Sequence, residues 1–284
     1  MFVVAGVTGH TGKVVAETLL AQSLPVRVIV RDAKKGEAWK AKGAEVVVAD
    51  VKDVKAMIQA LRGASGAYLL NPPDLSVTDI AKWGQESGAA FKAAISESGV
   101  PHVVFLSSIG AQQPTGTGPV VSLHHIEKAL SGLKTHVTFL RAGYFMENTL
   151  ANLHPMKEQG VLPAMLGAQL EIEMVATADI GALAAELLRA GLSAPKVVEL
   201  SGPRARTLTE VGQAFSTALH KPITLAPVPP AAQEGVLVSV GLPPTWAKAY
   251  ADMNAALASR QMVFEGTPRR GLIGLEQFVA RALS

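Results

Sequence analysis

The chain opens with a short apolar run that leads directly into a glycine-rich turn. Residues 2–5 read Phe-Val-Val-Ala, and glycines follow at positions 6, 9 and 12. This spacing predicts a buried strand, a tight turn and a helix N-terminus whose backbone N–H groups bind a pyrophosphate. An ordinary βα turn that happens to be rich in glycine is the alternative. The residues predicted to form this phosphate site are Gly6, Thr8, Gly9, His10, Thr11 and Gly12.

The composition indicates a folded chain with a large core. Of 284 residues, 49% are hydrophobic and 17% are charged, which excludes a disordered chain and suits a sheet covered on both faces. Cysteine is absent, so disulfides and thiolate chemistry are excluded. The net charge is only +3, and the basic residues are scattered along the chain. This pattern predicts no nucleic-acid partner. With no basic leader and no apolar run of about 20 residues, we expect a cytoplasmic protein without membrane association.

Over the first 140 residues, short β-branched runs alternate with amphipathic stretches. This alternation predicts an α/β fold, a Rossmann-type doubly wound parallel sheet with right-handed crossovers. Asp53 is expected to cap a helix, and a long helix over residues 78–98 is expected to end at Gly99, before Pro101. The predicted strands cover residues 2–5, 26–30, 45–49, 67–70, 103–106 and 135–140.

Beyond Leu140 the alternation weakens, and prolines and glycines interrupt the chain. We expect short strands over 171–175 and 196–200, with a helix between them that starts near Asp179. This arrangement suggests that the chain returns to the sheet. Thr207 and Glu210 form a capping box before a further helix. We therefore predict a smaller C-terminal α/β lobe that binds the substrate. The predicted dinucleotide-binding domain comprises residues 1–148 and 176–201, and the lobe comprises residues 149–175 and 202–284.

The residues after the second predicted strand bear on which dinucleotide binds. An acidic residue about 20 positions past the glycines selects NAD by accepting a bond from the ribose 2′-hydroxyl. Arg31 stands at that place, and Lys34 and Lys35 follow within one turn. These cations predict binding of a 2′-phosphate, and hence NADPH. A solvated basic helix start is the alternative, and the neighbouring Asp32 keeps NADH possible.

Two further strand ends contribute residues to the same expected edge of the sheet, where open α/β sheets bind ligands. Asp50 and Val51 follow the third strand. Asp50 either accepts a hydrogen bond from adenine or caps the next helix, and the sequence does not decide between these roles. Leu70, Asn71 and Pro72 follow the fourth strand and are expected to line the dinucleotide cleft.

Several motifs recur in order along the chain. After the glycines and Arg31 with Lys35 come Ser107-Ser108, Glu127-Lys128-x-Leu130, and residues 140–148, which read Leu-Arg-Ala-Gly-Tyr-Phe-Met-Glu-Asn. Together they resemble the NmrA-like branch of the atypical short-chain dehydrogenases, over nearly the whole chain. The group that looks most similar contains NAD(P)H:quinone reductases, triphenylmethane dye reductases and flavin-free azo dye reductases. The resemblance implies hydride delivery from a nicotinamide.

The chain departs from the wider superfamily in its acid–base chemistry. Standard members use Tyr-x-x-x-Lys, in which the lysine lowers the pKa of the tyrosine. The tyrosines here are Tyr68, Tyr144 and Tyr250, and none has lysine four residues later. Related reductases often have histidine four residues before the glutamate, where this chain has Leu123. His124, on one helix face with Glu127 and Lys128, is therefore the predicted proton donor, although a surface histidine is the commoner situation.

The resemblance also assigns roles to residues after the fifth and sixth strands. Ser107 occupies the place of the superfamily's catalytic serine. The alternative is that it only terminates the strand. Gly143, Tyr144 and Phe145 resemble residues that close over the nicotinamide, with core packing as the alternative. Leu162, Met165, Trp246 and Tyr250 are further candidates for lining the substrate cleft. The predicted catalytic residues are His124, Ser107 and Lys128, and no histidine spacing indicates a metal.

These features predict an NAD(P)H-dependent reductase that uses NADPH without flavin or metal. Its partner is expected to be a flat, electron-poor aromatic acceptor of the quinone, azo or triphenylmethane dye type. The main alternative is a redox-sensing regulator that binds NADP(H) without catalysis. A reductase or isomerase for one dedicated metabolite is a third possibility. The oligomeric state is expected to be a monomer or a homodimer.

Overall fold

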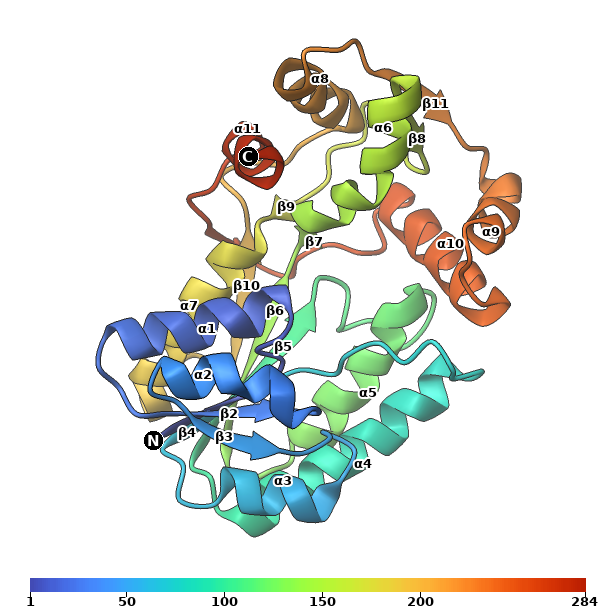
Figure 1. The fold of residues 1–284 in the computed structure, drawn as a ribbon. Coiled ribbons are helices and arrows are strands. Elements are labelled where there is room, and N and C mark those ends of the chain that lie inside the picture. Colours follow the sequence, from blue (N-terminus) through green and yellow to red (C-terminus); the bar gives the residue numbers. More distant parts are fainter.

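A parallel sheet of eight strands forms the centre of the computed structural model, which describes residues 1–284 (Figure 1). Its strand order is β12-β10-β6-β5-β4-β1-β2-β3, and each neighbouring pair is parallel. The order reverses between β1 and β4, which opens a crevice at the carboxyl ends of the strands. The strands are β1 (Phe2–Val4), β2 (Val26–Val30), β3 (Glu45–Val48), β4 (Gly66–Leu69), β5 (His102–Ser108), β6 (His136–Ala142), β10 (Val197–Ser201) and β12 (Arg269–Arg270). The predicted doubly wound parallel sheet is confirmed.

Helices cover both faces of the sheet, which explains why its strands are almost continuously apolar. One apolar core forms between the sheet and α1, α2 and α7, and a second forms between the sheet and α3, α4 and α5. The helices of the first face are α1 (His10–Ala21), α2 (Glu37–Ala41) and α7 (Thr177–Ala190); those of the second are α3 (Val54–Leu61), α4 (Ile80–Ser98) and α5 (Val121–Leu130).

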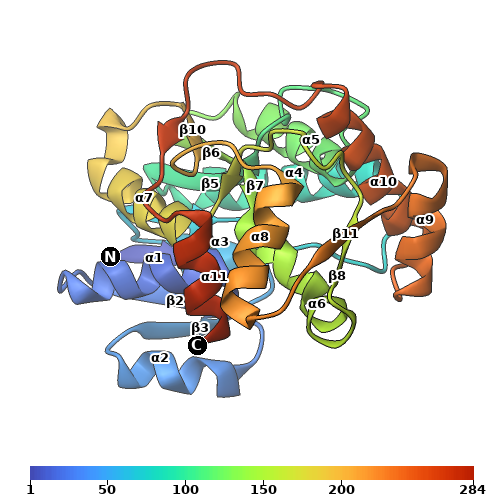
Figure 2. The same ribbon diagram turned by 90° about the horizontal axis from the view of Figure 1, so that it is seen from above.

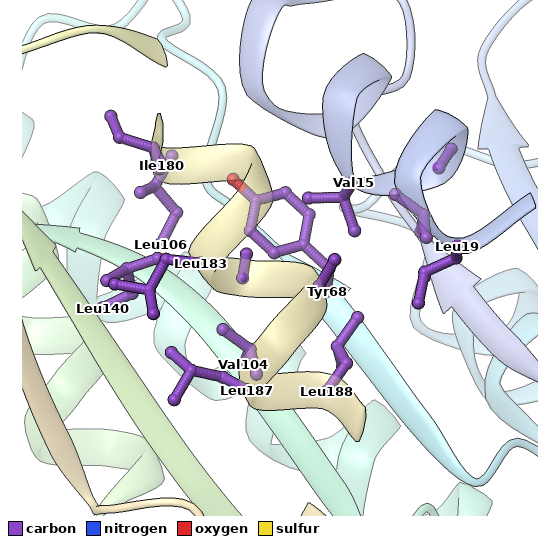
Figure 3. Packing of buried hydrophobic residues seen from close by; sticks show 14 of the residues in the cluster. Val15, Leu19, Tyr68, Val104, Leu106, Leu140, Ile180, Leu183, Leu187 and Leu188 are labelled. Atoms are coloured by element: carbon purple, nitrogen blue, oxygen red, sulfur yellow. The ribbon is translucent and has the colours of Figure 1, made fainter. Parts of the chain in front are cut away.

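α7 contributes more residues to the first core than any other single element, and its apolar side chains point at the middle strands (Figure 3). Leu187 lies near Val104 of β5, and Tyr68 of β4 lies between α7 and α1. Burying each such leucine contributes about 1.5–3 kcal/mol. The hydroxyl of Tyr68 donates a 2.8 Å hydrogen bond to Thr11 at the start of α1. This core therefore holds the first turn of α1 against the end of β4.

The local capping signals in the sequence are found in the structure. Asp53 accepts a hydrogen bond from the N–H of Ala56 and caps α3, as predicted. The long predicted helix is α4, which ends at Gly99 with a φ of 72°. Thr207 and Glu210 form the expected capping box at the start of α8 (Leu208–Leu219). These features depend on near neighbours only, which is why the sequence was sufficient to predict them.

A second group of elements lies above the carboxyl ends of the sheet in Figure 1 and is seen from above in Figure 2. It has its own apolar core, which includes Met156, Phe215 and Phe278. A two-stranded parallel sheet joins β8 to β11 within it. Its elements are α6 (Leu153–Gln159), β8 (Val161–Ala164), α8 (Leu208–Leu219), β11 (Thr224–Pro227), α9 (Pro230–Ser239), α10 (Pro244–Ala258) and α11 (Leu275–Leu283).

Two strand assignments differ from the sequence-based expectation. The strand expected over 171–175 shortens to β9 (Met174–Val175), which pairs with β7 (Tyr144–Phe145) and not with the main sheet. Only β10 makes the predicted return. Conversely, β12 pairs with β10 at the sheet edge, although its residues fall in the predicted lobe. No helix is long and apolar enough to cross a membrane.

Candidate active site

The glycine turn lies at the carboxyl end of β1, beside the switch in strand order. Gly6 has a φ of 70°, which glycine adopts at little cost. A Cβ at Gly12 would lie 2.4 Å from the Ala5 carbonyl oxygen and 2.6 Å from the Gly6 oxygen. A Cβ at Gly9 would approach protein atoms no closer than 3.4 Å. Gly12 is therefore required for helix–strand packing, whereas Gly9 leaves the outer side of the turn open to a ligand.

The first turn of α1 has the properties of an anion site. Gly9 is its N-cap and supplies no side-chain hydrogen bond, so N–H groups of the first turn remain free. Thr8 and His10 are exposed beside them. The side chain of Thr11 points elsewhere, because its buried hydroxyl accepts the bond from Tyr68. Thr11 thus offers a ligand its backbone only. A dinucleotide pyrophosphate fits this turn of free N–H groups and absent side chains.

A basic cluster follows β2, as the sequence predicted. Arg31, Lys34 and Lys35 are exposed, and none takes part in an ion pair. The neighbouring Asp32 accepts a 3.0 Å hydrogen bond from the N–H of Lys34 and caps a short 3₁₀ helix, Ala33–Gly36. Since this carboxylate caps the turn, it is less free to bind a ribose hydroxyl. The cluster therefore favours a phosphate at this position.

The residues after β3 and β4 lie on the same edge of the sheet. Asp50 accepts a 2.9 Å hydrogen bond from the N–H of Lys52 and so stabilises a turn; the helix cap is Asp53. Val51 is half-buried beside it. Leu70 closes over the glycine turn, because a Cβ at Gly6 would lie 2.5 Å from its Cδ2. The amide nitrogen of Asn71 is buried without a hydrogen-bond partner, as expected of a group that meets a ligand.

A cavity of about 350 Å³ lies between this edge and α10. The sheet side contributes ends of β4, β5 and β6, and the lobe side contributes one face of α10. No lining side chain is charged. Of the predicted site residues, Leu70, Asn71, Ser107, Gly143, Tyr144 and Phe145 line it. The face of α10 consists of Trp246, Tyr250, Met253 and Leu257. Leu162 and Met165, also proposed for the lining, do not reach it.

Three aromatic rings form one wall of the cavity. The ring centroids of Trp83 and Trp246 are 5.8 Å apart in an edge-to-face arrangement. Those of Trp246 and Tyr250 are 6.1 Å apart. The indole N–H of Trp246 donates a 3.1 Å bond to the carbonyl of Asp74, in the loop after β4. This wall therefore joins the lobe to the main sheet and gives the cavity flat apolar surfaces.

Beside the cavity, Ser107 belongs to a buried polar network. Its hydroxyl donates a 2.5 Å bond to Glu127 of α5, whose carboxylate also pairs with both Nε and Nη2 of Arg141, at 3.0 and 2.7 Å. Ser107 and Arg141 are register partners in β5 and β6, which brings both to the same glutamate. Glu127 and Arg141 are only 7% and 6% exposed. The predicted catalytic serine is thus held by an ion pair.

The structure does not bring His124 or Lys128 to the cavity. Leu123 lines it, whereas the Nδ1 atom of His124 lies 2.9 Å from the carbonyl oxygen of Ala111. Lys128 is exposed. Successive helix positions differ by about 100°, so the one-residue offset noted in the sequence turns the imidazole away. The prediction that His124 or Lys128 acts in catalysis has no support from this geometry.

Comparison with known proteins agrees with the arrangement. A model of the NmrA-like family matches residues 1–265. The chain belongs to the NmrA-like family. It is 26% identical to the NAD(P)H azoreductase of Xenophilus azovorans, over 90% of this chain and 86% of that protein. It is 29% identical to quinone oxidoreductase 2 of Escherichia coli (strain K12), over 96% and 94%. The triphenylmethane reductase of Citrobacter sp., solved with NADP(H), superposes with a TM-score of 0.85 at 21% identity, over the full length of both chains.

Two residues of the NmrA-like motifs, Glu147 and Arg141, stabilise the fold, a role that the sequence did not lead us to predict. Glu147 accepts hydrogen bonds from the N–H and the hydroxyl of Thr177, at 3.0 and 2.5 Å, and so caps α7. Arg141 neutralises Glu127. The signal for the second role was present, because an arginine stood within an apolar run predicted to be a buried strand. A buried charge requires a partner.

Proposed function

We propose that this NmrA-like protein is an NADPH-dependent oxidoreductase that reduces a flat, electron-poor aromatic acceptor such as a quinone. The uncharged, aromatic-lined cavity at the carboxyl edge of the sheet is the observation that carries the proposal. It has no cationic group for a phosphorylated or carboxylated metabolite, and its rings suit stacking on a planar molecule. The azoreductase and quinone oxidoreductase relatives support the same class.

The chain's own residues would act mainly by binding and orientation. NADPH, when bound, supplies the hydride. The turn from Gly6 to Gly12 would bind its pyrophosphate, and Arg31 with Lys35 would bind the 2′-phosphate. Asp50, Val51 and Pro72 would border the adenosine half, whereas Leu70, Asn71 and residues 143–145 would border the nicotinamide half. The aromatic wall would exclude water and hold the acceptor flat against the nicotinamide.

The basic cluster leads to a prediction about cofactor selection. The double variant Arg31→Ala/Lys35→Ala is expected to bind NADPH about 10- to 100-fold more weakly, since a charge-assisted hydrogen bond contributes about 1.5–3 kcal/mol. Binding of NADH should change less than about twofold, because it lacks the 2′-phosphate. Fluorescence titration measures both affinities. Lys55→Ala, an exposed lysine of α3, is the control. Equal losses for the two cofactors would contradict the assignment.

The position of His124 leads to a second prediction. His124→Ala is expected to retain turnover within about twofold, because its imidazole contacts Ala111 and does not line the cavity. Leu123→Glu should by contrast impair turnover at least about tenfold, since it introduces a charge into the otherwise uncharged cavity lining. Steady-state NADPH oxidation with menadione compares the two. A large loss of turnover in His124→Ala alone would show that the histidine acts in the mechanism.

The function itself is tested by a screen of NADPH oxidation without added flavin. Menadione, an azo dye and malachite green serve as acceptors. We expect turnover with at least one of them. NADPH binding without any turnover would identify a sensor and reject the enzyme.

A further inference from the structure

The cavity raises the question of where a proton for the reduced acceptor comes from. A quinone that gains a hydride becomes a hydroquinone monoanion and then needs one proton. The lining contains no aspartate, glutamate, histidine, lysine or arginine side chain that could supply it. The proton must therefore pass from a hydroxyl group of the lining or from water.

The three serines of the cavity are already committed as donors. Ser107 donates to Glu127 at 2.5 Å, Ser108 to the Ile109 carbonyl at 3.1 Å, and Ser122 to the Pro119 carbonyl at 2.8 Å. A hydroxyl group has one hydrogen to donate. Each serine consequently presents only lone pairs to a ligand. Asn71 can still donate a hydrogen bond from this side, but an amide N–H does not give up its proton.

Two tyrosine hydroxyls remain, and their surroundings differ. Tyr144 follows β6 beside Asn148, and burial raises the pKa of Tyr144 to about 12. Tyr250 projects from α10 on the lobe side and makes no hydrogen bond with the protein. Its ring is oriented by Trp246, which is itself anchored to Asp74. Tyr250 is thus a positioned hydroxyl whose hydrogen is free.

We propose that Tyr250 is the proton donor to the reduced quinone, an assignment that rests on the proposed function. The hydride of NADPH carries two electrons and one hydrogen to the quinone, which leaves NADP⁺ and a hydroquinone monoanion. The Oη–H bond of Tyr250 breaks, its proton forms the second O–H bond of the hydroquinone, and water then reprotonates the tyrosinate. Burial raises the pKa of Tyr250, so its hydroxyl is protonated at neutral pH, and the proton transfer is driven by the negative charge that the hydride brings to the acceptor.

A comparison of two acceptors tests this step. Malachite green is a carbocation that becomes neutral when a hydride adds to its central carbon, so its reduction needs no proton. Tyr250→Phe keeps the ring in the aromatic wall and removes only the hydroxyl. We expect its kcat with menadione to fall about 10- to 100-fold, in the range of general acid catalysis, and its kcat with malachite green to stay within about twofold. The thermal midpoint should be unchanged, because the hydroxyl has no partner.

Tyr144→Phe tests the alternative donor, since it removes the other phenol of the same cavity, and His124→Ala is the control outside the lining. The assignment is overturned if Tyr250→Phe slows both acceptors equally, which would indicate packing, or slows neither. It is also overturned if Tyr144→Phe or His124→Ala alone slows menadione selectively. If the wild-type protein binds NADPH but reduces neither acceptor, the proposed function fails, and the proton donor fails with it. If malachite green alone is not a substrate, a solvent deuterium effect on menadione reduction that Tyr250→Phe abolishes supports the assignment, and an unchanged effect overturns it.

Discussion

Gly12→Ala is expected to lower the free energy of unfolding by about 3 kcal/mol, at the upper end of the usual cost of overpacking. The added Cβ would meet the Ala5 and Gly6 carbonyl oxygens at 2.4 and 2.6 Å. Both are main-chain atoms between β1 and α1, so neither can rotate away. The clash would push α1 off the strand and displace the N–H groups of its first turn. NADPH affinity should therefore fall about 100-fold or more.

Urea denaturation and fluorescence titration measure the two effects. Gly132→Ala is the control, because a Cβ there meets nothing within 4 Å and the residue does not have a positive φ. That variant should match the wild type in stability and in affinity. A Gly12→Ala protein of wild-type stability would show that the turn relaxes at low cost, and would contradict the packing argument.

Arg141→Met is expected to destabilise the protein by about 3–5 kcal/mol, because it leaves Glu127 as a buried charge without its partner. Both residues are almost fully buried, and the pair is bidentate. In Glu127→Gln/Arg141→Met, the neutral amide can still accept the hydrogen of Ser107. The double variant should recover at least about 1 kcal/mol relative to Arg141→Met, since no buried charge remains.

An exposed ion pair provides the comparison. Lys248 and Asp252 lie one turn apart on α10 and are 63% and 46% exposed. Lys248→Ala should cost less than about 1 kcal/mol. Chemical denaturation of all variants under one set of conditions gives the differences. A cost below about 1 kcal/mol for Arg141→Met would show that water reaches Glu127. The buried network would then contribute little to the stability of the protein.

The sequence was sufficient for most of the Rossmann-type half. The strand predicted over 26–30 is β2 (Val26–Val30), and the caps at Asp53 and Thr207 are where the motifs indicated. Each depends on apolar period or on hydrogen bonds between residues a few positions apart. The strand expected over 171–175 failed for the opposite reason. Its pairing with β7 depends on a segment some 30 residues earlier, which no local pattern reports.

The glycine turn, the basic cluster and the missing tyrosine–lysine dyad are properties of the sequence by itself, because each depends on residue type at a fixed local spacing. Which side chains face the cavity was decided by the tertiary structure. The rotation of α5 places Leu123, not His124, in the lining, and α10 brings Tyr250 into the same cavity as Ser107. α5 packs on α4, about 40 residues earlier, and α10 packs on residues 118–120, more than a hundred residues earlier. Helix period alone cannot tell which side of an amphipathic helix borders a ligand.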